Sequence, residues 1–228
     1  MRIGLVAEVK WEVREVCRQL KMTLVDPDDQ IWGATLNGHD VRLCLSGMIP
    51  SIAKERVTRF LDNHAPELMI SCGLAGALHS KVLVGDLIVQ TLDNALTTHT
   101  EQALTKQGIS FHVGPLITVT KPVLTPKARN KVSATSQAIG VDMESQTIAA
   151  LCQERGIRCM AIKGVSDGIN DDLSPILGGF EIVHIPKIAK HVLFSPSTWG
   201  LASRMARQSY SAATNLGQGV WATLQEVH

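Results

Sequence analysis

Long hydrophobic runs, a strong net charge and a targeting signal are all missing from this chain of 228 residues. No run of about 18 apolar residues occurs, which is roughly the minimum for a membrane-spanning helix. Lys and Arg are scattered and the formal net charge is only +1, so no strong field attracts nucleic acid or an anionic membrane. Acidic residues begin at Glu8, before any apolar segment of signal-peptide length. We therefore expect a cytoplasmic protein with no transmembrane segment and no nucleic-acid partner.

The chain also lacks the common motifs for binding metals, dinucleotides and nucleotide phosphates. Its five cysteines include no Cys-x-x-Cys pair, and its eight histidines show no ligand spacing such as His-Glu-x-x-His. A Gly-x-Gly-x-x-Gly fingerprint and a Walker-type Gly-Lys-Ser/Thr are absent as well. These absences predict no disulfide framework, no metal and no organic cofactor.

What the sequence does contain is a regular alternation of strand and helix patterns. An Asn37-Gly38 pair, a strong tight-turn signal, joins two strands into a hairpin over 31–45. Strands that alternate with helices favour a sheet covered on both faces, so the expected fold is α/β: a three-layer αβα sandwich with a mostly parallel, mixed central sheet. The expected strands are 3–7, 31–36, 41–45, 68–72, 87–89, 116–119, 139–141 and 159–165; the expected helices are 12–20, 51–64, 126–134 and 144–155; 93–112 is expected to be a loop plus a short helix, and 168–180 a loop.

The last part of the chain predicts a helical tail from about 182, split near Pro196. Trp199 and Trp221 lie in this tail and are expected to pack rather than to bind a ligand. An apolar side of the tail is the expected place for contact with a partner or a membrane surface. No repeat or linker occurs, so we expect a single domain over 1–228, and we expect it to form a homo-oligomer.

Polar or glycine-rich clusters follow several expected strands, which is where ligands bind in folds of this kind. Several carboxylates are therefore expected to converge on one cleft. Each cluster also has a purely structural explanation, because glycines make turns and acidic residues start helices, cap turns or face solvent. The clusters are the segment around Glu8 and Glu12, Ser46-Gly47, Gly73 to Gly76, Asp142 with Glu144, and Ser166-Asp167.

Converging carboxylates suit the cleavage of an N-glycosidic bond. The sugar becomes cationic as the base leaves, a general acid neutralises the departing base, and a general base activates the nucleophile on the opposite face. Two carboxyl groups in one cleft provide both functions when their surroundings raise the pKa of one and leave the other ionised.

Six short segments of the chain follow one another in a recognisable order. They are Met1 to Ala7 with Glu12 following, Leu45-Ser46-Gly47-Met48, Ser71 to Leu78, Val84 to Val89, Val141-Asp142-Met143-Glu144-Ser145, and Ile162 to Asp167. Together they resemble the nucleoside phosphorylase/nucleosidase superfamily, and in particular the methylthioadenosine/S-adenosylhomocysteine nucleosidases. The resemblance extends over about residues 1–170.

The resemblance implies a role for each matching residue. Asp167 would protonate or hydrogen-bond the base at N7, and Glu144 would bind the ribose hydroxyls, with Met143 packed on the face of the sugar. Glu12 would position and deprotonate water. The other implied substrate-binding residues are Ser46, Gly47, Gly73 and Gly76, which would shape the nucleophile side, together with Val123 and Ser166.

The chain departs from the nucleosidases at Leu74, where they have Ser, at Val123, where they have a base-stacking aromatic residue, and at Lys163, where they have Arg. The phosphate-binding arginines of purine nucleoside phosphorylases have no obvious counterpart, which favours hydrolysis of an adenosine-type nucleoside. The alternative is phosphorolysis with phosphate as co-substrate, since residues 120–125 and 193–199 resemble the hopanoid-associated branch that acts on adenosylhopane. A second alternative is a non-catalytic nucleoside-binding protein.

Overall fold

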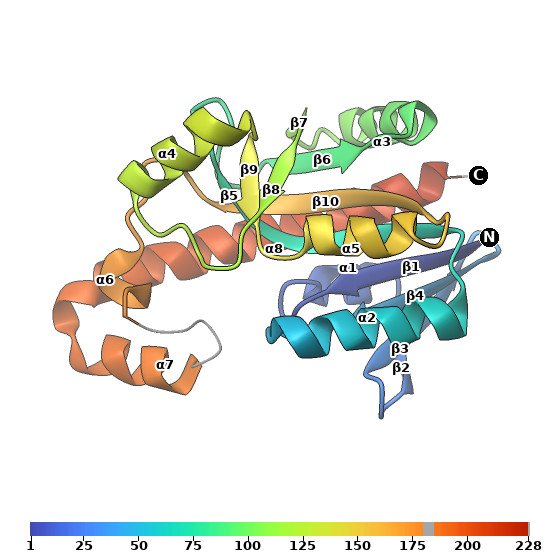
Figure 1. Ribbon diagram of the computed structural model, residues 1–228, viewed down its shortest axis with the longest axis horizontal. Coiled ribbons are helices and arrows are strands. Elements are labelled where there is room, and N and C mark those ends of the chain that lie inside the picture. The colour runs from blue at the N-terminus through green and yellow to red at the C-terminus, as the bar shows by residue number, and fades with distance from the viewer. Residues whose placement is uncertain (180–184, 228) are drawn as a thin grey trace.

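The computed structural model describes residues 1–179 and 185–227, and it has the predicted α/β architecture, with a central sheet between two layers of helices (Figure 1). Residues 182–184, at the expected start of the helical tail, lie outside the described residues. The strands are β1 (Arg2–Ala7), β2 (Thr23–Asp26), β3 (Ile31–Leu36), β4 (His39–Leu45), β5 (Leu68–Ala77), β6 (Leu87–Thr91), β7 (Phe111–Val113), β8 (Leu116–Thr118), β9 (Gly140–Asp142) and β10 (Arg158–Asp167). The helices are α1 (Arg14–Gln19), α2 (Pro50–His64), α3 (Asn94–Lys106), α4 (Pro126–Ser136), α5 (Ser145–Gln153), α6 (Ser174–Leu177), α7 (Ile185–Phe194), the short 3₁₀ helix η1 (Pro196–Thr198) and α8 (Trp199–Glu226).

The sheet is mixed and has a parallel centre. β1 pairs in parallel with β4 and β5, and β5 pairs in parallel with β10. Antiparallel pairs extend both edges: β3 and β2 lie beyond β4, and β6 lies beyond β10. β8 and β9 form a small parallel pair at the end of β5. Because the four central strands run in one direction, their carboxyl ends meet at one edge, and the residues that follow them lie close together.

Local sequence accounts for the best-predicted elements. Asn37 and Gly38 have positive φ angles of 49° and 80°, as a type I′ turn requires, and they join β3 to β4 as expected. α2 spans 50–64 against the predicted 51–64; it has a proline in its first turn and ends at Ala65 in the left-handed conformation.

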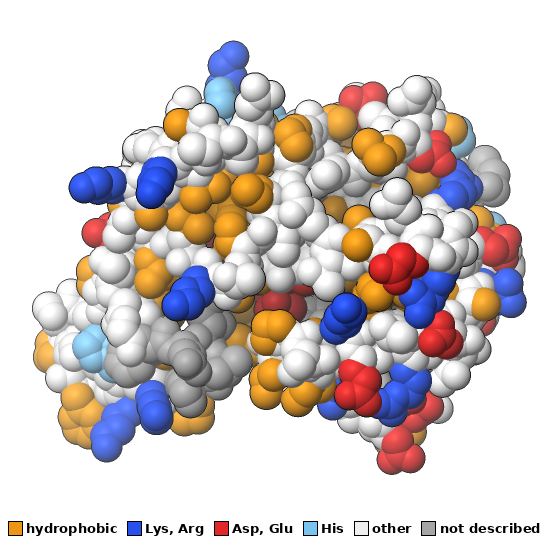
Figure 2. All heavy atoms as spheres, viewed as in Figure 1, with side chains coloured by type: hydrophobic (Ala, Val, Ile, Leu, Met, Phe, Trp, Pro, Cys, Tyr) orange, Lys and Arg blue, Asp and Glu red, His pale blue; other side chains and the backbone are white. Residues whose placement is uncertain are grey.

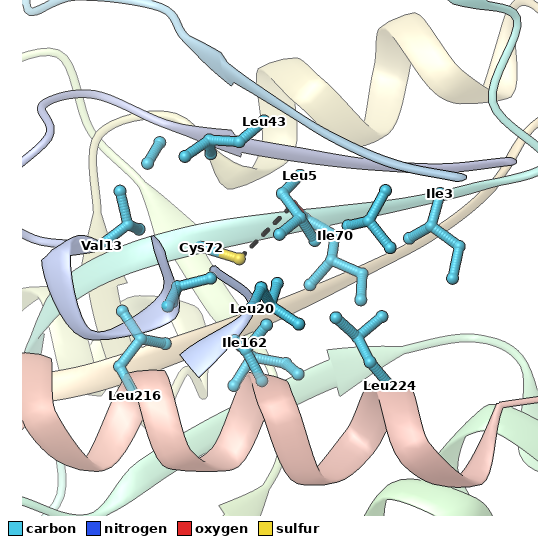
Figure 3. Packing of buried hydrophobic residues seen from close by; sticks show 14 of the residues in the cluster. Ile3, Leu5, Val13, Leu20, Leu43, Ile70, Cys72, Ile162, Leu216 and Leu224 are labelled. Atoms are coloured by element: carbon cyan, nitrogen blue, oxygen red, sulfur yellow. Dashed lines mark hydrogen bonds between the residues drawn. The ribbon is translucent and has the colours of Figure 1, made fainter. Parts of the chain in front are cut away.

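Helix α8 forms part of the core rather than a peripheral tail. Helices α2 and α5 lie on one face of the sheet, and α1, α3 and α8 lie on the other (Figure 1). Leu216 and Leu224 of α8 are buried in one cluster with Leu5 and Ile162 of the central strands (Figure 3). Full burial of such a side chain stabilises a fold by about 1.5–3 kcal/mol, so the second half of α8 contributes to holding the sheet in place.

The first part of the tail, in contrast, is exposed. The exposed fractions of Leu193 and Phe194 are 65% and 72%, and that of Trp199 is 54%, with its indole N–H donating to the carbonyl of Val192. Trp221 packs against the main core cluster, so the packing prediction is confirmed for Trp221 only. Contact of this surface with a partner or a membrane stays a prediction. Among the described residues, no helix has the length and apolar character needed to span a membrane.

Several elements are longer than the sequence predicts. β5 continues through the glycine-rich residues 73–77, because Leu74 pairs with Gly164 of β10, and Gly76 pairs with Val141 of β9. β10 likewise runs on to Asp167. α3 is a full helix of 13 residues, started by Asp93, whose side chain accepts hydrogen bonds from the next backbone N–H groups. β2 was not predicted, and α6 lies within the expected loop 168–180.

We expect Gly164→Ala to destabilise the fold, because α8 lies too close to β10 to admit a side chain there. A Cβ at position 164 would be 2.5 Å from the carbonyl oxygen of Ala212, a backbone atom that cannot rotate away. Overpacking of this kind costs roughly 1–3 kcal/mol, which thermal unfolding would show as a lower Tm. Gly200→Ala on α8 is the matched control, since a Cβ there meets nothing within 4 Å and alanine favours a helix. Equal Tm values for the two variants would contradict close α8–β10 packing.

Candidate active site

A cavity of about 180 Å³ opens at the edge where the parallel strands end. Figure 2 shows an acidic side chain in the hollow beside the N-terminal end of α2, with hydrophobic side chains around it. A smaller cavity of about 60 Å³ adjoins the first and shares Glu8, Met143 and Glu144 with it. The walls therefore combine an apolar surface with several carboxylates, the usual composition of a small-molecule site.

The structure brings the predicted site residues together. Three segments that are distant in sequence supply Glu12, Glu144 and Asp167 to the larger cavity. Gly73 lies beside two of these carboxylates, because a Cβ there would be 3.1 Å from Glu144 Oε1 and 3.6 Å from Glu12 Oε2. The predicted substrate-binding residues that line the larger cavity are Met143, Gly76, Val123 and Ser166, and those that line the smaller one are Ser46 and Gly47. Their chemical roles stay predictions.

The two acidic residues at the β9–α5 junction differ in function. Asp142 is buried and accepts hydrogen bonds from the Thr118 hydroxyl and from the backbone N–H of Ser145, at the start of α5. Asp142 therefore has the structural role of an acidic residue at the start of a helix, where it accepts a hydrogen bond from a free backbone N–H. Both acids line the cavity, but Glu144 makes no capping hydrogen bond and forms an ion pair with Lys163.

Lys163 is the buried cation of the acidic end of the cavity. Its side chain is completely buried on β10, and its ammonium pairs with Glu144 and lies 3.3 Å from Asp142 Oδ2. Burial alone lowers the pKa of a lysine, but the neighbouring Glu144 and Asp142 outweigh it, so the pKa of Lys163 is raised and the side chain stays charged. Lys163, at the position where the nucleosidases have Arg, is thus held in place by two carboxylates.

Glu8 and Glu12 lie next to this pair and hold their protons unusually tightly. Burial raises the pKa of Glu12 to about 8, and the charge of Glu144 adds to the effect. Burial and Glu144 likewise raise the pKa of Glu8 to about 9. Among the residues that the structure describes, none forms a hydrogen bond with Glu12 Oε2. Both carboxyl groups are therefore mainly protonated at neutral pH, which limits the excess negative charge that the site must bury.

Arg129 and Asp167 form a second buried ion pair at the other end of the cavity. Arg129 of α4 is only 1% exposed, and its Nη2 is 2.5 Å from Asp167 Oδ2. The other carboxylate oxygen, Oδ1, accepts a hydrogen bond from the hydroxyl of Ser166 at 2.5 Å. A Cβ on Gly76 would be 2.5 Å from Arg129 Nη1 and 2.7 Å from Asp167 Oδ2, so only a glycine of β5 leaves room for the pair.

The sequence did not identify Arg129 as a site residue, and it assigned no separate role to Glu8. Arg129 lies in a predicted helix outside every motif, and its helix has no continuous apolar face that would signal burial. Glu8 was visible only as part of the acidic segment after β1. Its position at the end of a parallel strand is the one signal that could have singled it out.

These features place the chain in a class of proteins: α/β enzymes with an acidic cleft at the carboxyl edge of a mixed sheet. The family model of the Phosphorylase superfamily matches residues 2–91 and 90–176. The chain belongs to this superfamily, which confirms the superfamily predicted from the sequence and, with it, the predicted class of enzyme, an N-ribosyl nucleosidase or nucleoside phosphorylase.

Individual proteins of known sequence or structure agree with this membership. The 5′-methylthioadenosine/S-adenosylhomocysteine nucleosidase of Buchnera aphidicola is 26% identical over 205 residues, which cover 73% of this chain and 84% of that protein. The structure of a Helicobacter pylori nucleosidase of the same name, in complex with butyl-thio-DADMe-Immucillin-A, has a TM-score of 0.79 at 13% identity and covers 100% of this chain and 99% of its own. The futalosine hydrolase of Helicobacter pylori has a TM-score of 0.78 at 12% identity, with 100% and 98% covered. These likenesses confirm the predicted fold.

The raised pKa values of Glu8 and Glu12 predict a stability that falls as the pH rises. The folded protein keeps protons on these groups up to about pH 9 and 8, whereas the unfolded chain loses them near the usual value of 4.5. Between these limits the folded state binds more protons, so the free energy of unfolding decreases with increasing pH. Thermal unfolding from about pH 5 to about pH 9 should show a falling Tm.

Glu8→Gln should make this fall shallower, because glutamine resembles the protonated carboxyl group in shape and does not titrate. Glu154→Gln is the control, since the Glu154 side chain is 69% exposed. A Tm profile of Glu8→Gln that runs parallel to that of the control would show that Glu8 titrates normally.

Proposed function

We propose that this chain hydrolyses the N-glycosidic bond of an adenosine-type purine nucleoside. The observation that carries the proposal is that carboxyl groups lie beside two different points of β5. Gly73 lies beside Glu12 and Glu144, and Gly76 lies beside Asp167. Three residues of a strand span about 10 Å, which leaves room for a ribose at one end and a purine base at the other.

Each group has a distinct part in this reaction. Glu12 takes a proton from water, whose oxygen forms a bond to C1′ of the ribose. The electron pair of the C1′–N9 bond moves onto the purine, which Asp167 protonates or hydrogen-bonds. Glu144 binds the ribose hydroxyls and stabilises the cationic sugar, and Met143 packs against it. Once ionised, Glu12 accepts a proton from water more readily than an ordinary carboxylate does, because burial raises its pKa to about 8.

The charges around the expected nucleophile support water rather than phosphate. Glu8, Glu12 and Glu144 line this part of the cavity, and the ammonium of Lys163 is already paired with two carboxylates. A phosphate dianion beside Gly73 would meet the negative charge of Glu144, and the ammonium of Lys163, which lies against that glycine, already has two carboxylate partners. A neutral water molecule is not repelled. The Buchnera aphidicola relative, which is named as a nucleosidase, agrees with this choice.

Product analysis tests the proposal directly. Incubation with adenosine-type nucleosides, including one with a large apolar 5′ substituent, should release adenine and a free ribose sugar. Added phosphate should neither accelerate the reaction nor appear in the product. Formation of ribose 1-phosphate would establish phosphorolysis instead. Binding of the nucleosides without any release of base would favour the non-catalytic alternative.

Glu12→Gln should reduce hydrolysis by about 10²-fold or more, because glutamine cannot accept the proton of water. In the parent enzyme, kcat/KM should rise with pH up to about 8, where Glu12 becomes ionised. The variant should lose this dependence on pH along with its rate. Glu154→Gln, with its exposed side chain, should keep both. A Glu12→Gln enzyme that retains the parent's rate and pH profile would remove Glu12 from the reaction.

A further inference from the structure

The near-neutral charge of the whole chain hides one basic segment in its helical tail. Residues 185–225 contain four Lys or Arg residues and no Asp or Glu, whereas the formal net charge of the chain is only +1. Lys187 and Lys190 of α7 are both exposed. Among the residues that the structure describes, none forms an ion pair with either lysine. Helix α7 thus presents two positive charges to its surroundings.

The same helix exposes large apolar side chains. Leu193 and Phe194 are both largely exposed, and they follow Lys190 at spacings of three and four residues, which place the three side chains on one face of α7. The exposed Trp199 lies at the end of this helix, where its indole N–H donates to the carbonyl of Val192. Figure 2 shows hydrophobic side chains next to Lys or Arg side chains over α7. What we call the α7 surface consists of Lys187, Lys190, Leu193, Phe194 and Trp199.

The α7 surface lies close to the larger cavity. Helix α7 packs against the short helix α6, and His191 Nε2 lies 3.0 Å from the carbonyl oxygen of Pro175 in that helix. Leu173 and Leu177, at the two ends of α6, line the cavity. One short helix therefore separates the cavity from α7, which is a distance of about 10 Å, the diameter of a helix.

We propose that the α7 surface docks on a membrane that contains anionic lipids. Its two lysines meet the negatively charged headgroups, and Leu193, Phe194 and Trp199 enter the boundary between the headgroups and the acyl chains. Basic residues beside exposed Leu, Phe and Trp are the combination by which a helix binds in the plane of a membrane surface. Docking of this kind requires no helix that spans the membrane.

The charge of the α7 surface argues against a second copy of the chain as its occupant. In a two-fold dimer the same patch of each copy meets its counterpart, so the lysines of two α7 surfaces would lie near one another. Like charges placed together at an interface are unfavourable, whereas an anionic lipid surface is complementary to both lysines.

Docking would hold the larger cavity beside the lipid surface. A nucleoside with a large apolar substituent partitions from water into lipid, so the docked enzyme would meet such a substrate at a high local concentration. This consequence rests on the proposed function, whereas the docking itself does not.

Flotation of the full chain with lipid vesicles at low ionic strength tests the proposal. Vesicles of phosphatidylcholine mixed with phosphatidylglycerol should bind the protein about tenfold or more tightly than vesicles of phosphatidylcholine alone, because each lysine near an anionic surface adds about fivefold. The double variant Lys187→Gln/Lys190→Gln should lose most of this preference. The control Lys21→Gln/Lys106→Gln removes the same charge from exposed positions outside α7 and should keep the preference.

Leu193→Ser measures the apolar contribution, because serine removes the side chain that would enter the lipid. This variant should bind the anionic vesicles about fivefold or more weakly than the parent. Leu92→Ser is the matched control, since Leu92 is fully exposed between β6 and α3, and it should change the affinity by less than about twofold. All of the substituted side chains are exposed, so we expect every variant to fold.

A parent protein that does not float with the anionic vesicles would overturn the inference, and so would equal losses of affinity in Leu193→Ser and Leu92→Ser. Self-association that Leu193→Ser abolishes, without any binding to vesicles, would assign the α7 surface to a second copy of the chain instead. Binding to vesicles without release of base from any nucleoside would overturn the proposed function alone.

Discussion

The arrangement of the cavity depends on the buried ammonium of Lys163. This side chain reaches from β10 to the junction of β9 and α5, where it contacts Asp142 and Glu144. Burying an unpaired carboxylate is strongly unfavourable, so neither acid could occupy its position without a nearby cation. One ammonium cannot balance Glu8 and Glu12 as well. Glu8 and Glu12 instead retain their protons, as their raised pKa values indicate, so they add no further buried negative charge.

The sheet supplies the geometry that this charge balance requires. β1, β5 and β10 are parallel neighbours, so the residues at their carboxyl ends are brought together without long connecting loops. The sequence predicted this convergence because each strand is a short apolar run followed at once by polar or glycine residues. It also predicted α2 and the Asn37-Gly38 hairpin almost to the residue, since helical periodicity and turn chemistry are local signals.

Features that depend on partners distant in the chain could not be predicted in the same way. Residues 73–77 have the composition of a loop, yet they continue β5 because β10 and β9 offer backbone partners on both sides. α3 contains four threonines and one histidine, which weaken its helical pattern, and its start is fixed by the side chain of Asp93. Arg129 has the sequence context of a solvent-facing helix residue. Its burial becomes understandable only with Asp167 and the bare backbone of Gly76 beside it.

The two ion pairs place charged groups at both ends of the cavity. At one end the cation Lys163 lies beside Glu144, and at the other Arg129 contacts Asp167. In both pairs the cation is at least as deeply buried as its carboxylate partner, and the side chains of both carboxylates are 15% exposed. The carboxylates are thus held in place by groups that are themselves fixed in the core. Folding bears the cost of orienting these charges, so no reorganisation is needed when charge develops on a bound ligand. An apolar cavity of the same shape would hold a nucleoside but would not favour the separation of its base from its sugar.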